Sequence, residues 1–205
     1  MFVICAVRPK RLTSISNKKG NRVMKGFSRE NQLLALCGLN CGLCSMFLSK
    51  HCPGCGGGEG NQSCKIARCS LEHGGVEYCF QCGEYPCEKY EHIDEYDIFI
   101  TRRNQKRDLT KARQIGIEAY NAEQAEKEKI LDTLLSGFND GRKKTLFCVA
   151  VNLLELQELR EVLRQIEDKP DLDTLTLKEK SAFAAGMLQA AAAKSGLDLK
   201  LRKKK

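Results

Sequence analysis

The spacing of apolar side chains divides the chain into a helical second half and a first half without a regular period. Between about Arg142 and Glu167, apolar residues recur at spacings of three and four, which places them on one face of a helix. These residues are Leu146, Ala150, Leu153, Leu156, Leu159, Leu163 and Ile166. The pattern predicts a single helix over 142–167 with one buried side, ended by Asp168-Lys169-Pro170.

Three further helices are predicted around this one. Helix-forming residues with spaced apolar positions fill 108–120 and 121–135, and the second stretch ends at Gly137. Thr176 and Glu179 have the spacing of a capping box that opens a helix over about 177–194, and Gly196 closes it. We therefore expect an α protein in which residues 105–195 form a small helical bundle.

The segment before the bundle has neither a helical nor a strand period. From Cys37 to Cys87 it is punctuated by Gly, Pro and Cys, although a helical pattern begins just after Met24. Few aliphatic side chains are available there, so apolar burial cannot offset the entropy lost when the chain is ordered. We expect a small irregular module over 30–100 that bound metal holds together, because the free energy of metal binding becomes free energy of folding.

Cysteine is concentrated in this module. Ten of the twelve cysteines fall between Cys37 and Cys87, and three pairs have two residues between their members: Cys41 with Cys44, Cys52 with Cys55, and Cys79 with Cys82. That spacing lets two thiolates of one turn point at a single tetrahedral ion. The alternative, a disulfide scaffold, belongs to secreted proteins. The apolar start MFVICAV precedes the basic residues, which reverses the order of a signal peptide, so we expect a cytoplasmic protein with reduced thiols.

The predicted metal ligands are these ten cysteines: Cys37, Cys41, Cys44, Cys52, Cys55, Cys64, Cys69, Cys79, Cys82 and Cys87. Two zinc ions with four thiolates each need eight of them, so either two are spare or a third ion binds with help from His51 or His73. The order along the chain does not tell which cysteines share an ion. An iron–sulfur cluster is the alternative cofactor, because thiolates suit both.

The spacing of Cys37, Cys41 and Cys44 is also that of radical S-adenosylmethionine enzymes. Those enzymes need alternating strands and helices after the motif, and this chain continues with further cysteines and then helices. A catalytic zinc keeps an open position and usually has histidine or carboxylate ligands, so a nearly all-thiolate set favours a structural role. We expect no enzyme, name no catalytic residue, and expect Cys148, in the apolar run LFCVAVNLL, to be a buried packing residue.

The net charge of +8 resides at the two ends of the chain. Twelve of the 34 basic residues lie in 1–26 and 200–205, which leaves 22 basic and 26 acidic residues in 27–199, a net charge of −4. We expect 1–26 to be a basic disordered tail, with Met24 as an alternative start, and 196–205 to be a second basic tail. The body is a poor partner for nucleic acid, and binding through the tails is a lesser alternative. No apolar run approaches the roughly 20 residues of a membrane helix. The partner that we expect is another protein.

The module resembles a known family of bacterial and archaeal proteins, domain of unknown function 3795. The resemblance is carried by Cys37-Gly-Leu-Asn-Cys41-Gly-Leu-Cys44, by Cys52-Pro-Gly-Cys55, by Cys64-Lys-Ile-Ala-Arg-Cys69 and by Tyr78-Cys79-Phe-Gln-Cys82-Gly-Glu-Tyr-Pro-Cys87. It continues through Ile115-Gly-Ile-Glu-Ala and Asn139-Asp-Gly-Arg, and so covers most of 30–165. The resemblance implies zinc binding and assigns no reaction. The family occurs frequently in anaerobes, so the resemblance also allows an iron–sulfur cluster as the cofactor.

Overall fold

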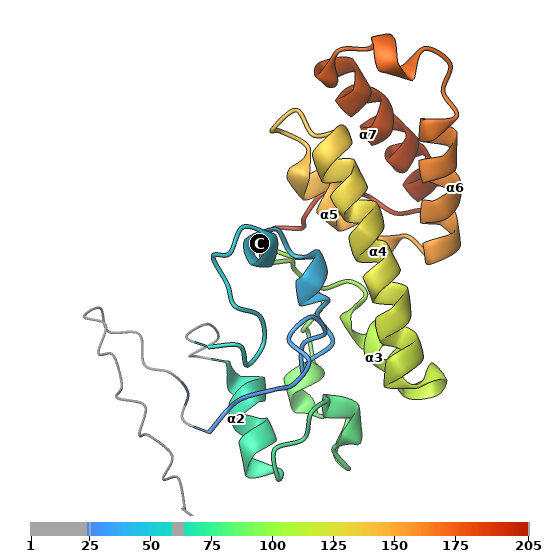
Figure 1. Ribbon diagram of the computed structural model, residues 1–205. Coiled ribbons are helices and arrows are strands. Elements are labelled where there is room, and N and C mark those ends of the chain that lie inside the picture. The colour runs from blue at the N-terminus through green and yellow to red at the C-terminus, as the bar shows by residue number, and fades with distance from the viewer. Residues whose placement is uncertain (1–23, 25, 59–63, 205) are drawn as a thin grey trace, which may run out of the picture.

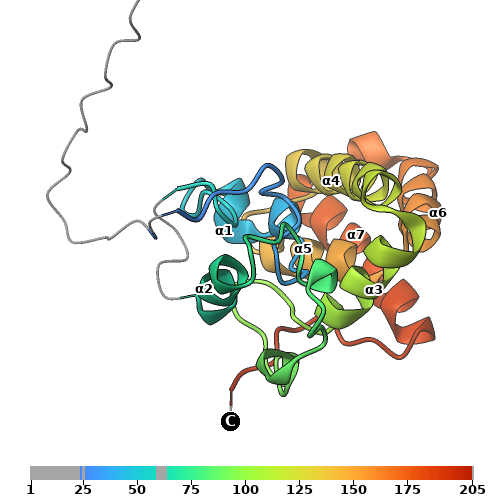
Figure 2. The same ribbon diagram turned by 90° about the horizontal axis from the view of Figure 1, so that it is seen from below.

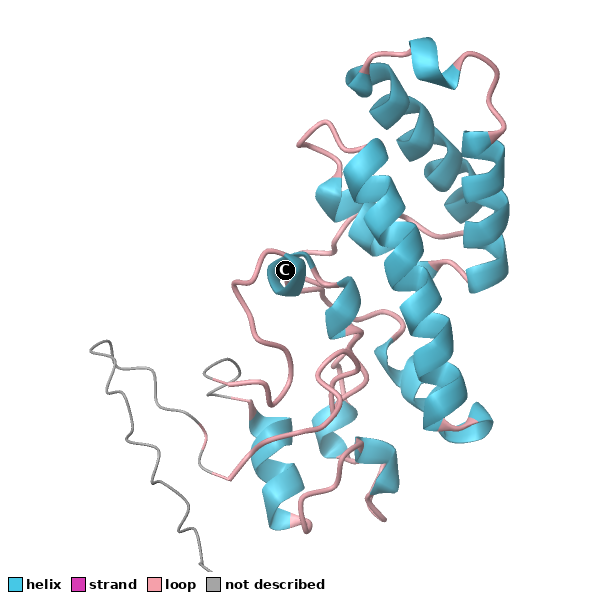
Figure 3. Cartoon of the chain, viewed as in Figure 1, coloured by secondary structure: helices cyan, strands magenta, loops and turns pink. Residues whose placement is uncertain are grey.

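The computed structural model describes residues 24, 26–58 and 64–204, and the chain in these ranges is mostly helical (Figure 3). They contain no strand, only an isolated antiparallel bridge between Leu34 and Asn40. The predicted α class is therefore confirmed. The predicted disordered tail up to residue 23, and Cys5 within it, lie outside the described residues.

Five longer helices build the second half of the chain: α3 (Gln105–Ile115), α4 (Ile117–Gly137), α5 (Lys144–Leu153), α6 (Leu156–Glu167) and α7 (Leu177–Lys194). In Figures 1 and 2, α5, α6 and α7 gather along the second half of the long helix α4. Their shared core is aliphatic and aromatic, with fully buried side chains such as Leu131, Phe147, Leu159 and Leu188. Among the described residues, no helix combines the length and apolar character needed to cross a membrane.

The single helix predicted over 142–167 is wrong, because the structure divides it into α5 and α6. Leu154 is extended (φ −74°, ψ 146°), and Glu155 caps α6 by donating its backbone N–H to the Glu158 carboxylate at 2.8 Å. The Nζ of Lys127, from α4, donates to the Leu154 carbonyl oxygen at 2.7 Å. This hydrogen bond satisfies a backbone acceptor at the break between the two helices. Residues on both sides of the break face one core, so their spacing alone does not reveal it.

The predicted boundary between the helices 108–120 and 121–135 is also displaced. The chain breaks at Gly116, whose φ of 86° favours glycine, and Tyr120 is buried inside α4. Two other helix signals are confirmed. Helix α6 ends at Glu167 before the proline, and α7 begins with a capping box in which the Thr176 N–H donates to the Glu179 carboxylate at 2.9 Å.

In its described residues, 30–58 and 64–100, the cysteine-rich module has short helical pieces: η1 (Cys41–Leu43), α1 (Ser45–Leu48), α2 (Lys65–Glu72), η2 (Cys79–Gln81) and η3 (Glu88–Tyr90). It lies to one side of the bundle (Figures 1 and 2). A small core of its own includes Leu36, Ala67 and Tyr90, and Leu109 of α3 joins it. A further short helix, η4 (Leu172–Thr174), connects α6 to α7.

The helical pattern after Met24 does not produce a helix. Instead, the Asn31 carboxamide oxygen accepts the backbone N–H groups of Leu33 and Leu34 at 2.9 and 3.1 Å. Such a side-chain turn competes with the helical hydrogen bonds of the same backbone groups.

The segment after α7, predicted as a basic tail over 196–205, returns to the folded body. Leu199 is buried, and the backbone N–H of Arg202 donates to the Asp97 carboxylate at 2.8 Å. In return, the Asp97 N–H donates to the Arg202 carbonyl oxygen at 2.8 Å. The guanidinium of Arg103 also donates to the Lys200 carbonyl oxygen at 2.9 Å. The described part of this segment therefore packs along the end of the cysteine module.

Candidate metal centre

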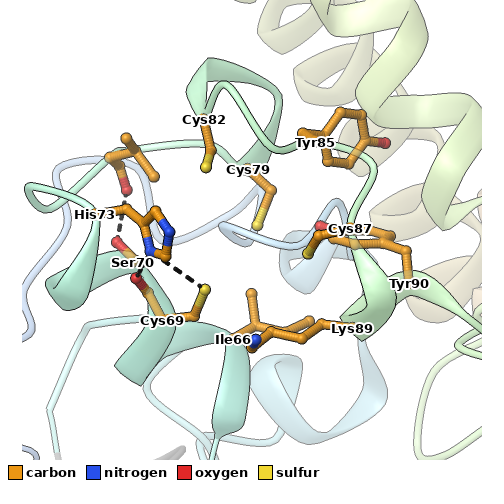
Figure 4. Close-up of a pocket in the computed structure, with 11 residues that line it drawn as sticks. Ile66, Cys69, Ser70, His73, Cys79, Cys82, Tyr85, Cys87, Lys89 and Tyr90 are labelled. Atoms are coloured by element: carbon orange, nitrogen blue, oxygen red, sulfur yellow. Dashed lines mark hydrogen bonds between the residues drawn. The ribbon is translucent and has the colours of Figure 1, made fainter.

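Four of the predicted ligands surround one small cavity. Cys69 lies on α2, Cys79 begins η2, Cys82 follows η2, and Cys87 precedes η3. Figure 4 shows their sulfur atoms pointing toward the middle, with Ile66, Tyr85 and Tyr90 around them. The cavity has a volume of about 20 Å³, which is room for a single ion or water molecule.

A tight turn brings Cys79 and Cys82 to the same side of the chain. The Cys82 N–H donates to the Cys79 carbonyl oxygen at 3.0 Å, and the Tyr78 N–H donates to the Gln81 side chain at 2.9 Å. The Cys79 N–H donates to the Leu36 carbonyl oxygen at 2.9 Å, which fixes the turn to the first part of the module. These two thiols thus lie on the same side of one turn.

His73 lies at the rim of this cavity. Its Nδ1 is 2.8 Å from the Cys69 carbonyl oxygen and 3.6 Å from the Cys69 sulfur, while its Nε2 is 3.3 Å from the Glu84 carboxylate. The bond to the Cys69 carbonyl, with a smaller effect of Glu84, raises the pKa of His73. A nitrogen that donates a proton cannot ligate a metal at the same time. In this arrangement His73 supports Cys69 as a hydrogen-bond donor. His51 is exposed and does not line the cavity.

The other cysteines of the module group around Cys41 and Cys55. Burial, with the neighbouring thiolates of Cys55, Cys44 and Cys52, raises the pKa of Cys41 to about 12. The pKa of Cys37 is also raised by burial and then by three thiolates, those of Cys55, Cys64 and Cys41. Thiols that burial and neighbouring thiolates keep protonated are the kind that a cation between them would ionise. This second group is Cys37, Cys41, Cys44, Cys52, Cys55 and Cys64.

A buried arginine, which the sequence did not single out, lies beside the second group. The Arg29 side chain is 1% exposed and donates to the carbonyl oxygens of Leu34 at 2.8 Å and Glu77 at 2.7 Å. Burial raises the pKa of Cys55, and the charge of Arg29 opposes this rise by favouring the thiolate. Arg29 is far from Cys55 in sequence, so no spacing rule could have joined the two.

No three cysteine, histidine or carboxylate side chains in 24, 26–58 and 64–204 lie in an arrangement that could hold one ion. An ion would therefore have to draw the thiols inward, and metal sites are rarely preformed before the metal binds. The donor chemistry nevertheless fits zinc, since thiolates are its usual ligands in structural sites. Cys148 is buried on α5, as predicted, and burial, with a smaller effect of Cys44, raises its pKa to about 12.

The chain matches a protein-family model over part of its length. The model of a family described as "Protein of unknown function (DUF3795)" matches residues 33–92, the range that contains all ten predicted ligands. The matched range ends before α3, so the similar stretches at 115–119 and 139–142 lie outside it. Neither the curated proteins nor the solved structures provide a match to this chain. The match lies within the cysteine-rich module and supports the resemblance of this module to the DUF3795 family.

Proposed function

We propose that the cysteine-rich module binds zinc through its cysteine thiolates, and that the metal has a structural role. The observation that carries the proposal is the set of four sulfur atoms around one ion-sized cavity, from Cys69, Cys79, Cys82 and Cys87. Four thiolates complete the tetrahedral coordination of zinc and leave no open position for a substrate. The ion would stabilise a segment that has few aliphatic side chains, and so maintain a surface for contact with another protein.

A second zinc ion would bind in the group around Cys41 and Cys55. The electrostatic contacts support two arrangements of four thiols, and the neighbouring thiols Cys41 and Cys55 belong to both. One arrangement adds Cys44 and Cys52, which makes two pairs with two-residue spacing. The other adds Cys37 and Cys64. Arg29, which also pairs with the Glu77 carboxylate at 3.0 Å, would place a positive charge beside a four-thiolate site in both cases.

Metal analysis of the full chain, purified without oxygen, tests the proposal. We expect a colourless protein with about two zinc ions per chain. A brown protein that contains iron and an equal amount of sulfide would refute zinc and support the iron–sulfur alternative. A protein that contains no metal after purification and after zinc reconstitution would refute both metal hypotheses.

Paired substitutions assign the ligands. Replacing Cys79 and Cys82 with serine removes one zinc ion, whereas Cys148→Ala, a buried cysteine outside the module, removes none. If Cys44→Ser with Cys52→Ser removes the second ion and Cys37→Ser with Cys64→Ser does not, the two closely spaced pairs hold it. The reverse result assigns the other arrangement.

A further inference from the structure

The cavity of the four thiols contains a buried hydroxyl group, that of Tyr90, without a hydrogen-bond partner among the described residues. Tyr90 is the last residue of η3, three residues after Cys87. It is only 3% exposed, so water does not replace the missing partner. A buried polar group without a partner destabilises the folded state, and most such groups have one. The hydroxyl therefore points to an acceptor within the thiol cavity.

Packing fixes the direction of the Tyr90 side chain. The Tyr90 N–H donates to the Cys87 carbonyl oxygen at 2.9 Å, and the ring packs edge-on against Tyr85, with the centroids 4.9 Å apart and an angle of 87° between the planes. In Figure 4, Tyr90 points in among the cysteine sulfur atoms, whereas the hydroxyl of Tyr85 points away from them. The two tyrosines thus line one cavity, and their hydroxyl groups have different directions.

The electrostatic contacts favour the sulfur of Cys79 as the acceptor. Burial raises the pKa of Cys79 to about 12, and the Tyr90 hydroxyl opposes this rise by stabilising the thiolate. A neutral thiol is a weak acceptor, whereas hydrogen bonds to an ionised group are shorter and about twice as strong as neutral ones. A metal that ionises Cys79 would therefore supply the acceptor that the hydroxyl lacks.

We propose that Tyr90 is a positioning residue of the metal centre, and that its hydroxyl donates a hydrogen bond to the metal-bound thiolate of Cys79. This inference rests on the proposed function, since it requires a metal that is held by Cys79. The hydrogen bond fixes the direction of the sulfur and withdraws electron density from it, and contacts of this kind increase the affinity of a site for its metal.

Two matched substitutions test the proposal in the full chain. Tyr90→Phe removes the hydroxyl and keeps the ring, and Tyr85→Phe makes the same change on the neighbouring ring. Competition with a chromogenic chelator measures the zinc affinity. Tyr90→Phe should weaken the binding of one ion about tenfold, and this ion should be the one that the paired substitution of Cys79 and Cys82 removes. Tyr85→Phe should bind both ions as the wild type does.

Two further measurements separate this role from packing. With excess chelator present, Tyr90→Phe should melt at the same or a higher temperature than the wild type, because a buried hydroxyl without a partner is gone. With cobalt(II) in place of zinc, Tyr90→Phe should shift the thiolate-to-cobalt charge-transfer absorption to longer wavelength, because a thiolate without its hydrogen bond gives up electron density more readily. Tyr85→Phe should leave this absorption unchanged.

The outcomes distinguish this proposal from the proposed function. If the chain binds zinc and Tyr90→Phe has the affinity and the cobalt absorption of the wild type, the role of Tyr90 is refuted and zinc binding stands. A lower zinc affinity that comes with a lower melting temperature in chelator and no shift of the absorption would make Tyr90 a packing residue, which also overturns the proposal.

A brown iron–sulfur protein would overturn zinc alone. Tyr90→Phe should then lower the reduction potential of the cluster, because a hydrogen bond to a thiolate ligand stabilises the reduced form, and an equal potential would overturn the role of Tyr90 as well. A chain that binds no metal would overturn both proposals together.

Discussion

Gly38 is the position where the fold of the cysteine module depends most sharply on the absence of a side chain. Its φ is +90°, and a Cβ there would lie 2.5 Å from the Gln105 carbonyl oxygen and 2.6 Å from Cγ of Leu109. Both atoms belong to α3, and the carbonyl oxygen is part of the helix backbone, which cannot move away cheaply. Gly38→Ala should therefore push the Cys37–Cys41 loop off the helix.

The expected loss of stability has two parts. The left-handed backbone costs an alanine about 1–2 kcal/mol, and overpacking against a rigid neighbour costs about 1–3 kcal/mol more. Together they give a loss of about 2–5 kcal/mol, reduced by up to about 1 kcal/mol because alanine also restricts the unfolded chain. Gly141 offers a matched control, since its φ is +89° but a Cβ there would meet nothing within 4 Å. Gly141→Ala should show only the backbone part.

Urea unfolding of the zinc-loaded wild type and both variants, followed by circular dichroism, measures these losses. The free energy of unfolding of Gly38→Ala should fall below that of Gly141→Ala by at least about 1 kcal/mol. A difference smaller than about 0.5 kcal/mol would refute the close packing of this loop on α3.

Three further outcomes follow from the structure. In Asp97, burial raises the pKa, but the N–H groups of Arg102 and Arg202 and the charges of Arg202 and Arg103 outweigh it, so the folded-state pKa lies below the ordinary value. The ionised carboxylate therefore stabilises the folded state above about pH 4, and this stabilisation disappears as the pH falls through the folded-state pKa. In urea titrations, Asp97→Asn should lower the free energy of unfolding by about 2 kcal/mol at pH 7 and by progressively less below pH 4. A loss that is the same at every pH would contradict this reasoning. Cys148→Ala should cost about 1–2 kcal/mol and leave the zinc content unchanged by atomic absorption, whereas loss of an ion would make Cys148 a ligand. Removal of metal with a chelator should increase amide hydrogen exchange in residues 64–90 and leave α4 to α7 protected, and uniform exchange throughout the chain would contradict a local role of the ion.

Local signals in the sequence predicted those features that local interactions produce. The capping box at Thr176, the end of α6 before Pro170 and the burial of Cys148 all depend on residues close in the chain or on a continuous apolar run. The two-residue spacing of Cys79 and Cys82 likewise predicted thiols on one side of a turn.

The features that the sequence did not reveal depend on contacts between distant segments. The break at Leu154 is stabilised by Lys127 from another helix, and the environment of Cys55 depends on Arg29. A cavity between residues 30–34 and α4 likewise joins segments that are distant in sequence. None of these pairs has a fixed spacing, so no pattern along the chain marks them.

The turn that carries Cys37, Cys41 and Cys44 is held from both ends by side chains of the bundle. Gln105 of α3 donates to the Cys37 carbonyl oxygen at 2.9 Å, and Asn152 of α5 donates to the Leu43 carbonyl oxygen at 3.3 Å.

Between these two contacts, Asn40 donates to the Asp108 carboxylate at 2.7 Å and accepts the Tyr120 hydroxyl at 3.0 Å. All three side chains of this central cluster are buried, so breaking one bond would leave a polar atom without water or partner. The bundle therefore holds the turn of the first cysteines, whereas Cys69 and Cys82 lack such contacts with the bundle. This difference is why we expect the metal to matter most for the segment from Cys64 to Tyr90, while polar contacts with the bundle hold the turn from Cys37 to Cys44.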